Sequence, residues 1–300
     1  QITEVGLLDM TLQNGYAADA SGGAVYSTES LYLSNVTVTG NTATGTVDGT
    51  GLGGGIYIIN GNLTLSESSV SYNTAENEGG GFYSVSGDVY IGYDYREAVT
   101  VTPGDTYASL LYNTTEGSGG AGVIVAASTV RVDMTAIGYN TADVFGGGLY
   151  IDSSNTSMVN TTISNNTSGL NGGGVSAIGG SLDLNFVTVA NNVAGTLSIV
   201  QDFGGGIYQS SGSLSITNSI ISQNWSNAVD GDHNDYYGGA GVTIGTADYN
   251  VVGVTNRDAT FIAATGNLVY SNGDYAWDEL GLDTDIEDNG GNSWTVYVQK

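Results

Sequence analysis

Residues 140–166 read NTADVFGGGLYIDSSNTSMVNTTISNN, and residues 166–192 follow the same plan as NTSGLNGGGVSAIGGSLDLNFVTVANN. Both stretches run from one Asn to the next in 26 residues and carry three glycines at the same place. Short segments in which apolar and polar residues alternate, such as Leu-Asp-Leu at 182–184, have the pattern of β-strands. A fixed period of this length indicates a solenoid in which each repeat forms one coil.

The two signatures of this repeat, a glycine motif and an Asn, extend over most of the chain. The motif Gly-Gly-Gly-apolar-Tyr recurs at Gly53–Tyr57, Gly79–Tyr83, Gly146–Tyr150 and Gly204–Tyr208, with variants at Gly22–Tyr26, Gly119–Val123, Gly172–Ser176 and Gly238–Val242. The Asn positions of the repeat are Asn41, Asn73, Asn113, Asn140, Asn166, Asn192 and Asn224. We expect their side-chain amides to stack as an internal ladder and to occupy tight turns with left-handed backbone.

The repeat predicts an all-β fold, a parallel β-helix (solenoid) of about nine coils with a repeat of about 26 residues. Residues 1–300 then form a single domain, in which 245–300 hold irregular last coils and a C-terminal cap. The residue after each glycine motif is expected to point into the core and the following Tyr to point outward. A propeller is excluded because its blades need about 40 residues each.

Charge and composition exclude several classes of partner. The chain has 30 Asp and Glu against 4 Lys and Arg, for a net charge of −26. Nucleic acids and anionic membrane surfaces are excluded because both require clustered basic residues. No apolar run approaches the length of a membrane-inserted helix. With no Cys, the chain has neither disulfides nor thiolate metal sites.

The glycine motifs and Asn turns resemble the right-handed parallel β-helix repeats of bacterial surface proteins. These belong to the pectate-lyase-like superfamily and include the polymorphic outer-membrane protein and autotransporter passenger types. Tyr249–Gly253 followed by Asp288-Asn-Gly-Gly also resembles the end of large bacterial β-helix surface proteins. The resemblance covers roughly residues 20–291. It implies right-handed coiling and a secreted or cell-surface location.

Two acidic clusters are candidate calcium sites, because hard oxygen ligands in flexible loops suit Ca²⁺. Neither has the spacing of an EF-hand or of a calcium-binding β-roll, so a merely solvated acidic loop is the alternative. The lone His233 lacks the partners that a zinc site needs. The candidate calcium ligands are Asp230, Asp232, Asn234 and Asp235 in the first cluster and Asp283, Asp285, Glu287 and Asp288 in the second.

Outward tyrosines are the candidate ligand-binding residues: Tyr57, Tyr83, Tyr150 and Tyr208. Stacked rings with polar tips can bind sugars or pack against a neighbouring molecule, or they can simply shield the sheet. Catalysis by a polysaccharide lyase would need a basic residue, for which Arg131 and Arg96 are the candidates. Both have nearby carboxylates, and a polyanionic substrate would be repelled by the net charge.

The sequence therefore predicts a non-enzymatic, extracellular structural or adhesive surface protein. Its partners would be glycans, a host or cell surface, or further copies of itself assembled into filaments or layers by strand addition at the ends. Insertions at 42–52, 193–203 and 225–237 leave from one corner of the repeat and would form the contact surface. The alternatives are a carbohydrate-active enzyme, either a polysaccharide lyase or a glycoside hydrolase, and a carbohydrate-binding module.

Overall fold

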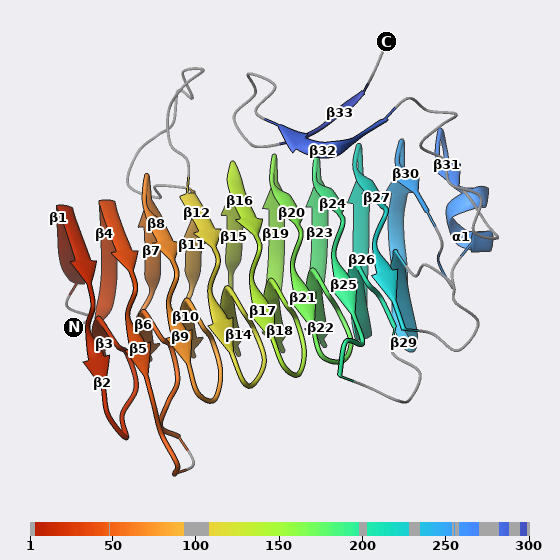
Figure 1. The fold of residues 1–300 in the computed structure, drawn as a ribbon. Coiled ribbons are helices and arrows are strands. Elements are labelled where there is room, and N and C mark those ends of the chain that lie inside the picture. The colour runs from red at the N-terminus through yellow and green to blue at the C-terminus, as the bar shows by residue number, and fades with distance from the viewer. Residues whose placement is uncertain are drawn as a thin grey trace.

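The chain forms a rod of stacked parallel strands that runs from β1 at one end to α1 at the other (Figure 1). This confirms the all-β fold and the parallel β-helix predicted from the repeat. The computed structural model describes residues 4–47, 49–92, 108–197, 203–227, 235–253, 255 and 258–269, and the backbone of 282–287 and 295–298.

Each full coil contributes a strand to four rows, and the first two rows follow the glycine motif. Every pairing within a row is parallel, and the strands pair with the equivalent residues of the next coil except at two register shifts between the last two long strands, 207–217 and 236–248. Row one comprises β3 (Val25–Ser27), β6 (Ile56–Ile59), β10 (Phe82–Val85), β14 (Gly122–Val125), β18 (Leu149–Asp152), β22 (Val175–Ile178) and the first parts of β26 (Ile207–Thr217) and β29 (Tyr236–Asp248). Row two comprises the first parts of β1 (Glu4–Gln13) and β4 (Ser30–Thr39), then β7 (Leu63–Ser66), β11 (Val89–Ile91), β15 (Val130–Asp133), β19 (Asn155–Val159), β23 (Ser181–Asn185) and the ends of β26 and β29.

The third and fourth rows lie on either side of the ladder asparagines. Row three comprises the ends of β1 and β4, then β8 (Ser69–Ser71), β12 (Ala108–Leu111), β16 (Thr135–Gly138), β20 (Thr162–Ser164), β24 (Thr188–Ala190), β27 (Ile220–Ser222), β30 (Val251–Val252) and β31 (Leu268–Val269). Row four comprises the two-residue strands β2 (Tyr16–Ala17), β5 (Thr42–Ala43), β9 (Thr74–Ala75), β13 (Thr114–Thr115), β17 (Thr141–Ala142), β21 (Thr167–Ser168), β25 (Val193–Ala194) and β28 (Trp225–Ser226).

Inward side chains of the first three rows form one continuous hydrophobic core along the rod. The residue after the glycine motif lies in this core, as predicted: Ile56, Phe82, Leu149 and Ile207 are all fully buried. Val25, in an early coil, is only half-buried. Because each coil is buried against two neighbours, the stability of the rod is close to a sum over coils and their interfaces.

The predicted asparagine ladder is present from Asn41 to Asn224, and its members are at most 1% exposed. Each Nδ2 donates to the Oδ1 of the next ladder Asn at 2.8–3.1 Å. The same Oδ1 accepts the backbone N–H of the preceding ladder Asn at 2.9–3.1 Å. A second Nδ2 hydrogen reaches a backbone carbonyl of the preceding coil. The buried amides are therefore satisfied at every rung, as burial of polar groups requires.

One expectation about the ladder is wrong. The left-handed backbone belongs to the residue before the Asn, for example Tyr72 (φ 54°) and Tyr139 (φ 57°), whereas Asn73 and Asn140 have ordinary φ values. The preceding residue turns the corner and points outward. The Asn that follows it then points into the rod and reaches the neighbouring coils.

The last described coils differ from the rest. Helix α1 (Asp258–Ala263) covers the end of the core with Phe261, which is fully buried and packs edge-on against Tyr236 at 5.9 Å. After it, β31 adds a final strand to β30. Strands β32 (Leu282–Glu287) and β33 (Thr295–Val298) form an antiparallel pair, and β33 lies against β24 on the side of the rod (Figure 1).

Candidate functional site

A row of outward tyrosines lies on the surface of row one. Strand register places Tyr26, Tyr57, Tyr83, Tyr150 and Tyr208 on one line, with Val123 and Ser176 in the two gaps. The Tyr57 ring stacks on Tyr26 at 5.1 Å and on Tyr83 at 5.7 Å between centroids. We call these five side chains the tyrosine row. Its first three rings form a rigid aromatic surface, because they stack on one another over the sheet.

A groove of about 590 Å³ runs beside Tyr83 and Tyr150. Its other wall is formed by residues that stand immediately before the glycine motif in successive coils, Leu52, Glu78, Ser118 and Phe145. The Phe145 ring stacks on Tyr150 at 6.3 Å between centroids. The groove is thus lined by aromatic rings and by a few polar groups, which is the usual character of a small-ligand site.

The loop that follows β5 borders this groove and is fixed to the rod by two side chains of the next coil. Glu76 Oε2 accepts the backbone N–H of Gly45 at 2.8 Å. Asn77 Nδ2 donates to the backbone oxygens of Gly45 at 3.0 Å and Thr50 at 2.6 Å. The loop therefore forms a fixed rim. Its predicted role in a contact surface stays a prediction.

Glu78 and Tyr83 form the polar pair of the groove. Burial raises the pKa of the Glu78 carboxyl above its usual value of 4.5, and a hydrogen bond with the Tyr83 side chain partly opposes that rise. Burial, followed by the nearby charge of Glu78, raises the pKa of the Tyr83 phenol far above 10.0. The same causes act on Tyr150, whose pKa is raised by burial and by Asp152 and Glu78. Glu78 is thus the carboxyl that burial makes costly to ionise in this groove.

Replacing Glu78 with Gln is expected to raise stability at neutral pH and to leave it unchanged in acid. The pKa of Glu78 is higher in the folded than in the unfolded protein. The stability that the protonated carboxyl contributes is therefore complete below the unfolded pKa, and it is lost as pH rises through the folded pKa. Urea unfolding of wild type and Glu78→Gln at about pH 4 and about pH 7 measures the difference. The exposed Glu116→Gln is the control. If Glu78→Gln is less stable than wild type at both pH values, burial does not make ionised Glu78 costly.

The four tyrosines predicted as ligand-binding residues fall into two groups. Tyr57, Tyr83 and Tyr150 lie at or beside the groove. Tyr208 lies beyond the Ser176 gap and stacks on Tyr237 at 5.7 Å, which in turn stacks on Phe203 at 4.3 Å. The structure therefore joins three of the predicted side chains in one place and leaves the fourth in a separate aromatic cluster.

Sequence reasoning missed the second wall of the groove. Leu52, Glu78, Phe145 and Phe203 all occupy the position immediately before a glycine motif. Leu52 and Glu78 form a bridge between adjacent coils, which places this position on its own line along the rod. The signal was present in the alignment of the repeats, but the position varies between apolar, acidic and polar residues and so does not resemble a motif.

Four of the eight predicted calcium ligands lie outside the described residues: Asp230, Asp232, Asn234 and Asp288. Asp283, Asp285 and Glu287 lie on β32, of which the structure describes the backbone. Asp235 is 2% exposed, and its Oδ1 accepts both the backbone N–H of Asn224 at 2.7 Å and its Nδ2 at 2.9 Å. Asp235 thus takes the place of the next asparagine in the ladder. Across the described part of the chain, acidic and His side chains form no group suited to a metal ion.

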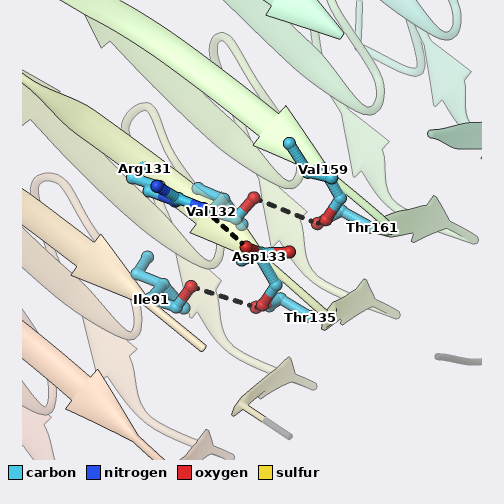
Figure 2. Close-up of polar contacts among 7 residues, drawn as sticks. All are labelled: Ile91, Arg131, Val132, Asp133, Thr135, Val159 and Thr161. Carbon is cyan, nitrogen blue, oxygen red and sulfur yellow. Dashed lines mark hydrogen bonds and ion pairs between the residues drawn. The ribbon is translucent and has the colours of Figure 1, made fainter. Parts of the chain in front are cut away.

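Arg131, a candidate base for the lyase alternative, faces a carboxylate on its own strand. Arg131 Nη2 lies 3.1 Å from Asp133 Oδ2, and the side chains are 41% and 12% exposed. Figure 2 shows this contact as a dashed line. Thr135 Oγ1 donates to the backbone oxygen of Asp133 at 2.7 Å and fixes the turn beyond β15. The guanidinium is therefore engaged in a local ion pair. Arg96 lies outside the described residues.

Comparisons of the chain with family models, with curated proteins and with solved structures give no match. Among the helices of the described residues, none has the length and apolar character to cross a bilayer. The architecture shown is thus the parallel β-solenoid with its asparagine ladder.

Proposed function

We propose that this β-helix is a non-enzymatic extracellular adhesive protein whose tyrosine row and groove bind a carbohydrate. The observation that carries the proposal is the groove itself, which Tyr83, Phe145 and Tyr150 line together with Glu78. Sugar rings present apolar C–H faces and a rim of hydroxyl groups. The aromatic rings can pack against the C–H faces. The Glu78–Tyr83 pair, Asn77 and Ser118 can hydrogen-bond the hydroxyl groups.

The negative charge of the protein favours neutral over acidic sugars as ligands. At −26 the rod repels polyanions such as polyuronates from most of its surface. Burial also disfavours ionised Glu78, so this carboxyl is suited to a hydrogen bond with a neutral hydroxyl. Neutral glycans are therefore the favoured ligands. An extracellular location, which the resemblance to bacterial surface β-helices supports, would place such glycans within reach.

A rigid scaffold suits an adhesive role. The ladder and the row pairings leave little freedom in the backbone under the tyrosine row, so little conformational entropy is lost on binding. Self-association into filaments or layers and calcium binding by the acidic loops stay predictions from the sequence. Because like-charged rods repel each other, self-association would depend on divalent cations or on high salt to screen the acidic loops.

Glycan-array binding is expected for the wild type and is expected to weaken about tenfold in Tyr57→Ala and in Tyr83→Ala, a loss of about 1.4 kcal/mol each. Tyr249→Ala is the matched control, since Tyr249 is 63% exposed and lies at another corner near the last coils. Wild-type protein that binds no neutral glycan, or variants that bind as wild type does, would overturn the proposal. Shortened glycans after incubation, lost in Glu78→Gln, would instead support the carbohydrate-active alternative.

A further inference from the structure

A second set of tyrosines projects from the corner between rows three and four, where sequence analysis singled out no site. Tyr72, Tyr112 and Tyr139 each stand immediately before a ladder Asn and turn the corner with φ of 54°, 56° and 57°. They are 60%, 41% and 48% exposed. The ring centroids are 4.8 Å apart between Tyr72 and Tyr112 and 4.9 Å apart between Tyr112 and Tyr139. We call these three side chains the corner stack.

The rings of the corner stack are close to parallel. Its ring planes differ by 6° and 12°, compared with 20° and 18° for the pairs that Tyr57 makes in the tyrosine row. The centroid separations equal the distance of about 4.8 Å between paired strands, so the rings follow the coils without splaying. The ladder explains the alignment of the rings. Each tyrosine is followed directly by a ladder residue, Asn73, Asn113 or Asn140, which hydrogen bonds to the neighbouring coils hold in place.

Neighbouring phenols held at this distance are reactants for oxidative coupling. Two dilute radicals must meet by diffusion, whereas these groups are already adjacent. The effective concentration of one phenol near the other is therefore higher by orders of magnitude. A slot of about 180 Å³, lined in part by Leu111, Gly138 and Thr162, opens beside Tyr112 and Tyr139. It gives these rings room to tilt into the geometry of a biaryl bond.

We infer that the corner stack is a modification site, at which oxidation by hydrogen peroxide through a haem peroxidase joins Tyr112 to Tyr72 or to Tyr139 as dityrosine. Each of the two phenols loses one electron and its O–H proton. The resulting phenoxyl radicals form one bond between ring carbons ortho to the oxygens. The proton on each of those carbons then moves to the oxygen and restores the phenol. Peroxide accepts the two electrons and two protons and leaves as two waters.

Other tyrosines are less suited to this reaction. Tyr83 is half-buried and hydrogen-bonded to Glu78, which limits its access to an oxidant. Tyr26 and Tyr57 stack at 5.1 Å but with planes 20° apart, and Tyr57 is only half-exposed. Tyr16, at 67% exposed, is hydrogen-bonded across to Thr44 and not to another phenol, so we expect it to couple only between molecules.

Such a bond would join coils that are distant in sequence. Ladder residues next to these tyrosines are separated by 40 residues for Asn73 and Asn113, and by 27 residues for Asn113 and Asn140. Closing loops of this size in the unfolded chain is the usual way in which a cross-link stabilises a fold. The chain has no Cys, so dityrosine would be its covalent link between coils.

Dilute protein treated with a peroxidase and limiting hydrogen peroxide tests the inference. The monomer fraction is isolated, its dityrosine fluorescence is measured, and the linked peptides are mapped by mass spectrometry. We expect links from Tyr112 to Tyr72 or Tyr139, loss of the monomer signal to near background in Tyr112→Phe, and an unchanged monomer signal in Tyr16→Phe. Tyr112→Phe keeps the aromatic stack, and Phe186 shows that Phe is accepted at such a corner with φ of 55°.

Three results would overturn the inference. Dityrosine confined to dimers and larger species would show that coupling is intermolecular. An unchanged monomer signal in Tyr112→Phe, or mapped links that exclude the corner stack, would place the reaction elsewhere. Circular dichroism of each variant checks that the fold is intact, so that a lost signal reports the missing phenol.

Discussion

Asn140→Ala is expected to destabilise the rod by about 4 kcal/mol, because two buried donors lose their acceptor at once. Asn140 Oδ1 accepts the backbone N–H of Asn113 at 2.9 Å and its Nδ2 at 3.1 Å. Asn140 Nδ2 itself donates to Asn166 and to the backbone oxygen of Leu110. Both asparagines next to it in the ladder are fully buried, so water cannot replace the lost bonds. Urea unfolding followed by circular dichroism measures the change.

The control for this prediction is Asn155→Ala, which removes an exposed amide on row two. Its hydrogen bonds to Ser128 at 3.4 Å and from Ser181 at 3.1 Å are at the surface, and we expect a change within about 0.5 kcal/mol. Equal, small effects of the two substitutions would show that the ladder contributes little to stability.

Gly147→Ala is expected to be at least as damaging as the ladder substitution, with a loss of about 4 kcal/mol or failure to fold. A Cβ at this middle glycine would lie 2.4 Å from the backbone oxygens of both Gly173 and Thr167. These atoms belong to the next coil and take part in its pairing, so the clash cannot be relieved by a side-chain rotation. The two coils would have to separate locally, and their row pairings would weaken.

Gly6→Ala provides the matched control for crowding. A Cβ there would have Leu8 Cδ1 at 3.8 Å as its nearest neighbour, which is an ordinary contact. Thermal unfolding of both variants should show a large decrease in Tm for Gly147→Ala and almost none for Gly6→Ala. A soluble Gly147→Ala protein with wild-type Tm would mean that the coils can shift apart without cost.

The fold was predictable from the repeat because every coil packs against its neighbours in the same way and so needs the same residues at the same positions. A middle glycine is required wherever the backbone of the next coil approaches, and an inward Asn is required wherever a corner leaves backbone groups unpaired. These requirements recur every 26 residues in the shortest coils, so they are visible in one sequence. The left-handed corner was misassigned because Tyr, Asn and Gln all precede the ladder Asn, and their shared property is backbone conformation.

The site was less predictable, because its residues are not required by the fold. The tyrosines of row one could be identified as outward from their position after the glycine motif. Glu78 and Phe145 could not be grouped with them, since only the closed coil brings the residue before the motif beside the residue after it. The position of Asp235 at the end of the ladder could not be predicted, because it follows Asn224 by 11 residues and so departs from the period.

The asparagine ladder also has an electrical direction. Each amide accepts from the coil before it and donates to the coil after it, without reversal from Asn41 to Asn224. An amide group has a dipole of about 3.5 D, and because the chain of bonds from one amide to the next keeps one direction, the components of these dipoles along the ladder reinforce one another. The positive end of this array meets the carboxylate of Asp235, as an anionic side chain meets the N-terminus of a helix. Because aligned hydrogen bonds polarise one another, a substitution at one rung should weaken rungs that it does not touch.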